Sequence, residues 1–263
     1  SPEHARHLAT FFDVTLMERL PDRGVPRAEW TEFLRRSILA NQPWDVMARE
    51  ILSADQSDPK ALYRIKFFTD RQAEPNLVTR DISRLFLGTN LQCAQCHDHP
   101  RIEEYKQEDY YGLLAFVGRP TMQGGGKRRN GASVGLIEKA DGETTFQSVF
   151  DPRKVTKTAV PRVPGGKPIL DPPSAKKPTT PVATKATKGN KGKAVATKAK
   201  SPAPVASEPA YSRRAKLASA LARADYLPFK RNIANRLWAF LMGRGLIDPL
   251  DMDHPANPPA YPE

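Results

Sequence analysis

Residues 84–100 read RLFLGTNLQCAQCHDHP. They contain the end of a segment with helically spaced apolar residues, followed by a cysteine motif. Apolar side chains recur at helical spacing from residue 75 up to Gly88, and a glycine commonly ends a helix. Cys93 and Cys96, the only cysteines of the chain, follow after residues 89–92. The pattern predicts a mainly α-helical protein whose cysteines lie in a loop between two helices.

Cys93, Cys96 and His97 form the pattern C-x-x-C-H, the attachment signature of a c-type haem. In such a site each thiol forms a thioether with a vinyl group of the porphyrin. The histidine then becomes the axial ligand of the iron. The motif therefore predicts haem c, attached to Cys93 and Cys96 and ligated by His97.

Three other interpretations use the same atoms: a redox-active dithiol, a structural disulfide, and a zinc or other metal site built from Cys93 and Cys96 with His97 or His99. A structural zinc site usually takes four ligands from two separated pairs, and the chain has no second cysteine pair. A thioredoxin-like dithiol follows a strand, whereas the flanks here predict helices. Haem attachment is the favoured interpretation, and zinc is the alternative cofactor.

The motif continues into Asp98, His99 and Pro100. His99 is too close to His97 along the chain to reach the opposite face of a haem. We expect Asp98 and His99 to orient His97, to hold the loop, or to belong to a separate metal site. A second axial ligand would come from elsewhere, and the candidates by residue type are Met122, Met47, Met17, His4, His7 and His254. The alternative is a five-coordinate haem without a second ligand.

Apolar residues spaced by three and four predict further helices on both sides of the motif. Prolines open several of them, as is common at the first helical position. The expected helical segments are 4–20, 27–40, one that begins at Pro43, 59–68, 75–87 and 108–116. After Gly118 the apolar period changes to two, and residues 134–139 and 144–149 predict two strands joined as a small β hairpin.

The net charge of +12 is concentrated in one segment. Residues 152–207 hold eleven Lys, two Arg and a single acidic residue, Asp171, whereas the remainder holds 28 basic and 28 acidic residues. The segment has ten prolines and no aromatic residue, so it lacks the apolar bulk that offsets ordering entropy. We expect a linker at 152–210, disordered at least over 174–207. Although this segment is basic, the absence of interleaved aromatic residues argues against nucleic-acid binding.

The linker separates a helical domain, 1–151, from a shorter C-terminal part, 211–263. Two helices are predicted in that part, and their apolar stripes should pack against the N-terminal body. Four polar residues there would either line a polar site or join the two parts: Asn235, Arg236, Arg244 and Asp248. The sequence contains no apolar span of transmembrane length and no signal-peptide pattern.

Residues 84–100, together with DYYGL at 109–113, resemble the planctomycete-specific domain of a family of secreted cytochrome-type proteins. NIANRLW at 232–238, GRGLIDP at 243–249 and NPP at 257–259 resemble the start of its C-terminal companion domain. The chain departs from the usual pattern after His99-Pro100, where members often have Phe-Asp, and in its Lys-rich linker.

The resemblance implies a secreted bacterial protein, often part of a larger multidomain chain, with haem at Cys93, Cys96 and His97. It also implies that the companion domain is truncated at Glu263. We therefore expect a periplasmic or secreted protein with a redox or electron-transfer role, whose partners are a redox protein or other domains of the full-length chain. The alternative is a noncatalytic scaffold or binding module whose loop is held by zinc or a disulfide. The sequence names no catalytic acid or base.

Overall fold

The computed structural model describes residues 1–53, 59–123, 127–128, 131–132, 135–173 and 211–260. This part of the chain is mainly α-helical, as predicted. Its α-helices are α1 (Pro2–Met17), α2 (Arg27–Leu39), α3 (Trp44–Ser53), α4 (Lys66–Thr69), α5 (Pro75–Leu87), α6 (Gln107–Val117), α7 (Arg213–Leu221) and α8 (Leu227–Met242). The 3₁₀ helices are η1 (Pro59–Ile65) and η2 (Leu91–Gln95).

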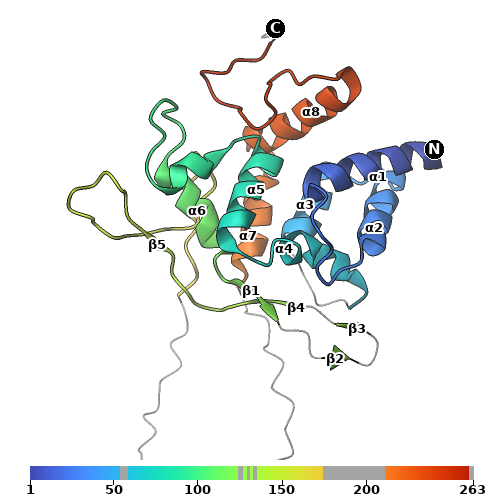
Figure 1. Cartoon of the computed structure of the whole chain (residues 1–263), viewed down its shortest axis with the longest axis horizontal. Coiled ribbons are helices and arrows are strands. Elements are labelled where there is room, and N and C mark those ends of the chain that lie inside the picture. Colours follow the sequence, from blue (N-terminus) through green and yellow to red (C-terminus); the bar gives the residue numbers. More distant parts are fainter. Residues whose placement is uncertain (54–58, 124–126, 129–130, 133–134, 174–210, 261–263) are drawn as a thin grey trace, which may run out of the picture.

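The helices form one body around a shared hydrophobic core (Figure 1). Helices α5, α6 and α7 lie at its centre, with α1 to α4 on one side and α8 packed against α5. The core contains Leu217 and Leu221 from α7 and Phe229 from α8, together with side chains of α1 to α6. The C-terminal helices therefore pack on the N-terminal body, as their apolar stripes predict.

Trp44, at the start of α3, connects three of these helices. Its ring is nearly parallel to those of Phe12 in α1, Phe86 in α5 and Phe229 in α8, with ring centroids 5.2, 5.8 and 6.0 Å away. Stacked aromatic pairs at such distances contribute beyond the apolar area that they bury. This cluster fixes α8 relative to the helices that precede the motif.

Helix α5 begins and ends as its sequence predicts. The Glu74 carboxylate accepts hydrogen bonds from the backbone nitrogens of Asn76 (3.1 Å) and Leu77 (2.6 Å), so it caps the free N–H groups of the first turn. Gly88 ends the helix in the left-handed conformation, with φ 68°. The cysteine motif therefore follows closely after a well-defined helix end.

The predicted β hairpin is wrong in its pairing. The strands are β1 (Pro120–Gln123), β2 (Lys127–Arg128), β3 (Gly131–Ala132), β4 (Gly135–Glu138), β5 (Thr145–Phe146) and β6 (Lys157–Thr158). Strand β4 pairs antiparallel with β1, and β5 pairs with β6. Alternation of side chains identifies a strand but not its partner, and here both partners lie outside the two predicted segments.

Part of the expected linker packs on the helical body. The Ala159 nitrogen donates to Thr144 O (2.8 Å), the Arg162 nitrogen donates to Gly112 O (3.2 Å), and the Val163 side chain is buried. Residues 174–210, which include the segment expected to be disordered, lie outside the described residues. No helix in the described ranges has the length and apolar composition needed to cross a membrane.

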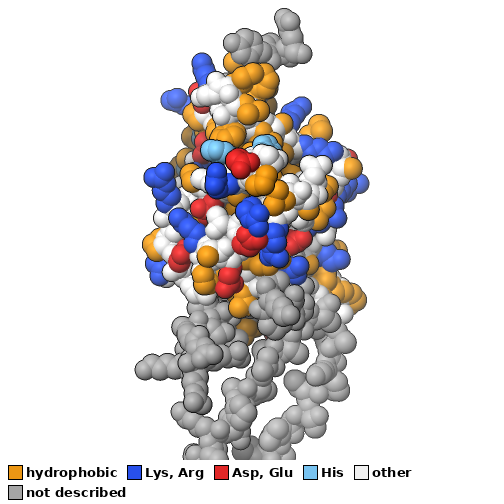
Figure 2. Space-filling view, turned by 90° about the vertical axis from the view of Figure 1, so that its right-hand side faces the viewer, with side chains coloured by type: hydrophobic (Ala, Val, Ile, Leu, Met, Phe, Trp, Pro, Cys, Tyr) orange, Lys and Arg blue, Asp and Glu red, His pale blue; other side chains and the backbone are white. Residues whose placement is uncertain are grey.

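Charges of both signs are mixed on the face shown in Figure 2. There the Lys and Arg side chains alternate with Asp and Glu and with hydrophobic groups, and they do not form one continuous basic patch. This distribution agrees with the balanced charge of the sequence outside the Lys-rich segment.

Candidate functional site

The cysteine motif lies on η2 and on the loop between α5 and α6. Asn90 caps η2, because its side chain accepts a hydrogen bond from the Gln92 nitrogen. A 3₁₀ helix has three residues per turn, so positions three apart eclipse each other. Leu91 and Ala94 accordingly share the buried face. Cys93 and Cys96 have the same spacing, and both thiols are exposed and not joined in a disulfide.

The His97 ring is held on two sides. Its Nδ1 lies 2.6 Å from the backbone oxygen of Asp98, and its ring centroid lies 4.6 Å from that of Phe150. A carbonyl oxygen can only accept, so this contact assigns the proton of the neutral imidazole to Nδ1. The lone pair then lies on Nε2, the nitrogen that can bind a metal.

Asp98 and His99 hold the loop. Asp98 Oδ1 accepts from the Gln107 nitrogen (2.9 Å), and Oδ2 lies 3.7 Å from Lys106 Nζ. His99 Nδ1 accepts from the nitrogens of Arg101 (3.2 Å) and Ile102 (3.0 Å). These contacts match the expected role of holding the loop, and the Asp98 carbonyl in addition orients His97.

A second segment crosses the motif, and we call residues 147–150 the strap. The Gln107 side chain donates from Nε2 to Gln95 O (3.3 Å) and to Gln147 O (3.0 Å). The Val149 nitrogen donates to Cys96 O (3.1 Å). The loop between α5 and α6 and the segment that carries β5 lie on the same side of the molecule in Figure 1. The local sequence gave no signal for this role of Gln107 and Phe150, because it depends on tertiary packing.

Two tyrosines of α6 lie behind the motif. The Tyr110 hydroxyl donates to Asn76 Oδ1 (2.8 Å), which also accepts from Gln95 Nε2 (3.1 Å). Burial raises the pKa of the Tyr110 and Tyr111 hydroxyls, and negative charge on Cys96 would raise both further. Both phenols are therefore neutral at physiological pH and act as hydrogen-bonding or packing groups.

The described side chains do not form a zinc site in this arrangement. No three His, Cys, Asp or Glu residues of the described ranges are grouped so that they could hold a metal ion. The Nδ1 of His99 already accepts two backbone N–H groups, so only its Nε2 could be a ligand. Zinc would therefore require His99 or another ligand to move.

The donor set fits haem attachment better, because that needs two accessible thiols and one nitrogen ligand. Cys93 and Cys96 are accessible, and His97 has Nε2 available. The proposed second ligands are scattered. Met17 and Met47 are buried in the core, Met122 packs against it, and His4 and His7 are exposed on α1.

His254 is connected to the motif through two ring contacts. Its ring centroid is 5.7 Å from that of Tyr105, which is 5.8 Å from that of His99, and both ring pairs are edge-to-face. Burial, with the charge of Asp253, raises the pKa of Tyr105. Next to these rings is a cavity of about 930 Å³, whose lining includes Leu91, Tyr105, Arg231, Ile247 and His254 but none of Cys93, Cys96 and His97.

Of the four polar residues predicted in the C-terminal part, Arg236 joins the two parts of the chain, together with Asn232. Asn232 Nδ2 donates to Leu85 O (2.7 Å), and the Arg236 guanidinium donates to Arg84 O (2.7 Å) and to Asn232 Oδ1 (3.0 Å). Asn235 exchanges two hydrogen bonds with the Ile247 backbone. The contacts of Asn232 and Arg236 join α8 to the end of α5, whereas Asn235 bonds within the C-terminal part and lines the cavity beside Tyr105. Arg244 and Asp248 form an exposed ion pair with each other (3.2 Å).

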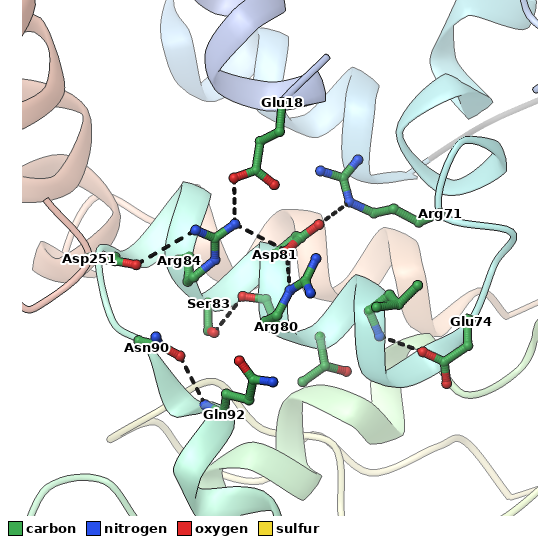
Figure 3. A network of polar contacts seen from close by, with 12 residues as sticks. Glu18, Arg71, Glu74, Arg80, Asp81, Ser83, Arg84, Asn90, Gln92 and Asp251 are labelled. Carbon is green, nitrogen blue, oxygen red and sulfur yellow. Dashed lines mark hydrogen bonds and ion pairs between the residues drawn. The ribbon is translucent and has the colours of Figure 1, made fainter. Parts of the chain in front are cut away.

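The same helix end belongs to the ion-pair network of Figure 3. Asp81 lies among Arg71, Arg80 and Arg84, and Arg84 also contacts Glu18 at the end of α1 and Asp251 near the C-terminus. The network connects α1, α5 and the C-terminal segment, and it lies on the helix that precedes the motif.

Comparison with known proteins gives one result. No curated protein and no solved structure matches this chain. Residues 2–121, which contain α1 to α6 and the complete cysteine motif, match the model of the family PSCyt2, described as a protein of unknown function (DUF1549), a planctomycete-type domain.

Proposed function

We propose that this protein is a redox module that carries a c-type haem on the loop between α5 and α6. The observation that carries the proposal is the combination of two exposed thiols at 3₁₀ spacing with a neighbouring imidazole whose Nε2 is free to bind iron. A surface loop gives both thiols access to the vinyl groups of a porphyrin.

The residues of the loop have separate roles in this proposal. Cys93 and Cys96 would hold a haem through two thioether bonds, and His97 Nε2 would be a ligand of its iron. When bound, haem supplies one-electron redox chemistry. The Asp98 carbonyl accepts from Nδ1 of His97, which fixes the ring orientation and makes Nε2 more basic.

The surface beside the thiols supports the proposal. Val149 is 65% exposed and Phe150 is 74% exposed, so two large apolar side chains of the strap lie uncovered next to Cys96 and His97. An apolar macrocycle attached to the thiols could bury part of this area, which would be favourable.

The proposal also has consequences for location and partners. Thioether haem is assembled outside the cytoplasm, so the protein would act in the periplasm or after secretion. An electron-transfer role requires a redox partner, which would be a separate protein or another domain of a longer chain.

The test is expression of the chain in a host with a cytochrome c maturation system. Covalent haem is detected by the Soret band of the purified protein and by haem staining after denaturing electrophoresis. We expect wild type and His7→Ala to carry covalent haem, and Cys93→Ala/Cys96→Ala to carry none. We expect His97→Ala to lose the spectrum of histidine-ligated iron. A wild-type protein that gains no covalent haem under these conditions would sink the proposal.

The second candidate is a noncatalytic binding module, and the cavity beside Tyr105 favours it. A volume of about 930 Å³ is in the upper part of the range typical of small-molecule sites. In this case the loop would be held by zinc or a disulfide. Metal analysis that finds zinc in the purified wild-type protein, or mass spectrometry that finds a Cys93–Cys96 disulfide, would support this candidate if covalent haem is absent.

A further inference from the structure

We infer that Gln107 and Phe150 are positioning residues for His97. Gln107 ties the strap to the motif, and the strap sets the Phe150 ring against the imidazole. The inference deepens the proposed function, and it depends on that function only for its effect at the haem iron. Phe150 lies outside residues 2–121, so this support comes from a part of the chain that the family match does not cover.

Gln107 has the chemistry needed for the tie. Its side chain is 4% exposed, and a buried amide must find hydrogen-bond partners. The amide NH₂ is the donor group, and it reaches two backbone carbonyls, at Gln95 in η2 and at Gln147 in the strap. A Leu at this position could fill the space but could not donate to either carbonyl.

The strap has further local supports. The Val149 nitrogen donates to Cys96 O, directly beside the second thiol. The Phe150 nitrogen donates to Ser148 Oγ (3.4 Å), and the Asp151 nitrogen donates to Ser148 O (3.2 Å), which closes a turn at the end of the strap. The backbone of the strap is therefore fixed on both sides of the point where Phe150 projects.

Phe150 contributes little to the hydrophobic core. Its side chain is 74% exposed, so most of its apolar surface remains in water. Its described ring contact is with His97, at 4.6 Å between centroids and 42° between planes. Together with the contact from Nδ1 to Asp98 O, this ring limits rotation of the imidazole and keeps Nε2 as the available nitrogen.

The first test uses NMR on the whole chain prepared without haem. The ring protons of His97, assigned with His97→Gln, should show a ring-current shift caused by Phe150. We expect Phe150→Leu to lose this shift and Gln107→Leu to reduce it, whereas Val149→Ala, which keeps the backbone tie, should retain it. Phe150→Tyr should also retain the shift, because it keeps an aromatic ring.

Identical His97 shifts in wild type and Phe150→Leu would overturn the inference. A shift retained in Gln107→Leu but lost in Phe150→Leu would overturn the role of Gln107. If Gln107→Leu does not fold, Gln107→Glu takes its place, since it keeps the shape but replaces the donor amide with an acceptor. Phe150 is exposed, so its variants should fold in any case.

The second test uses the haem-loaded chain and separates this inference from the proposed function. Covalent haem should form in wild type and in Phe150→Leu, because both thiols remain. The iron–histidine stretching band in resonance Raman spectra should weaken in Phe150→Leu and persist in Val149→Ala. Wild type without covalent haem would contradict the proposed function, while the NMR comparison would still decide the inference. An unchanged band in Phe150→Leu would contradict the inference alone.

Discussion

Asp98 Oδ1 lies 2.9 Å from the backbone nitrogen of Gln107, the first residue of α6. The first turn of a helix has N–H groups without partners and carries the positive end of the helix dipole, so a carboxylate there is favourable. Asp98 also follows His97 directly, and its backbone oxygen accepts a hydrogen bond from Nδ1 of His97. One residue thus links the candidate haem ligand to the start of the next helix.

Asp98→Ala should lower the free energy of unfolding by about 1 kcal/mol, the usual loss when a capping side chain is removed. Asp98→Asn is the matched control, because its amide oxygen can still accept from Gln107. Urea denaturation monitored by circular dichroism measures both variants. Equal midpoints for wild type and Asp98→Ala would show that the cap contributes nothing.

Asp171 lies between two buried arginines. Its carboxylate is 2.6 Å from Arg119 and 2.8 Å from Arg213, whose side chains are only 5% and 3% exposed. Removing it would leave two buried cations with less compensation, so Asp171→Ala should cost about 3 kcal/mol of stability. Leu170→Ala, at the neighbouring exposed position, is the control and should leave thermal unfolding nearly unchanged. Equal melting temperatures for the two variants would refute this assignment.

The same pair of arginines predicts a pH dependence. The hydrogen bond from Arg213 is the largest influence on Asp171, and with Arg119 it lowers the carboxyl pKa below its usual value of 3.8, despite partial burial. A lowered folded-state pKa gives stability that is present above 3.8 and is lost as the pH falls through the folded-state value. The stability difference between wild type and Asp171→Asn should therefore be constant near pH 7 and shrink below pH 3.8. A difference that grows on acidification would contradict the lowered pKa.

These residues also show which information was local in the sequence. The spacing of apolar residues and the signals at Pro75 and Gly88 were sufficient to predict α5, since propensity and capping act within a few residues. The position of the cysteine motif between two helices was predictable for the same reason. Asp171 was assigned to a charged linker, because nothing near it indicates that it neutralises two buried arginines. The strand pairs and the contact of Phe150 with His97 are also long-range, so the local pattern could not predict them.

Gly88 predicts a difference between two glycine substitutions. It has φ 68°, and an added Cβ would lie 2.9 Å from Asn232 Oδ1 and 3.3 Å from Leu250 O. Gly243 has a similar φ of 81°, but a Cβ there would meet nothing within 4 Å. Gly243→Ala should thus cost about 1 kcal/mol for the left-handed backbone alone. Gly88→Ala should cost clearly more in chemical denaturation, because it also pushes α8 from the end of α5. Equal losses would mean that the contact between Gly88 and Asn232 adjusts freely.

Asp81 predicts the largest effect among the ion pairs of Figure 3. Its side chain is 0% exposed and lies 2.6 Å from both Arg71 and Arg80, while Arg71 is 1% exposed. Removing one member of a buried pair leaves an uncompensated charge, so Asp81→Ala should lower the free energy of unfolding by about 3–5 kcal/mol. The matched control is Glu32→Gln, which removes an exposed pair with Arg35 and should produce no measurable change. A small loss in Asp81→Ala, measured by urea denaturation beside this control, would mean that the arginines reach water when Asp81 is removed. The network would then not be what fixes α1, α5 and the C-terminal segment around the motif.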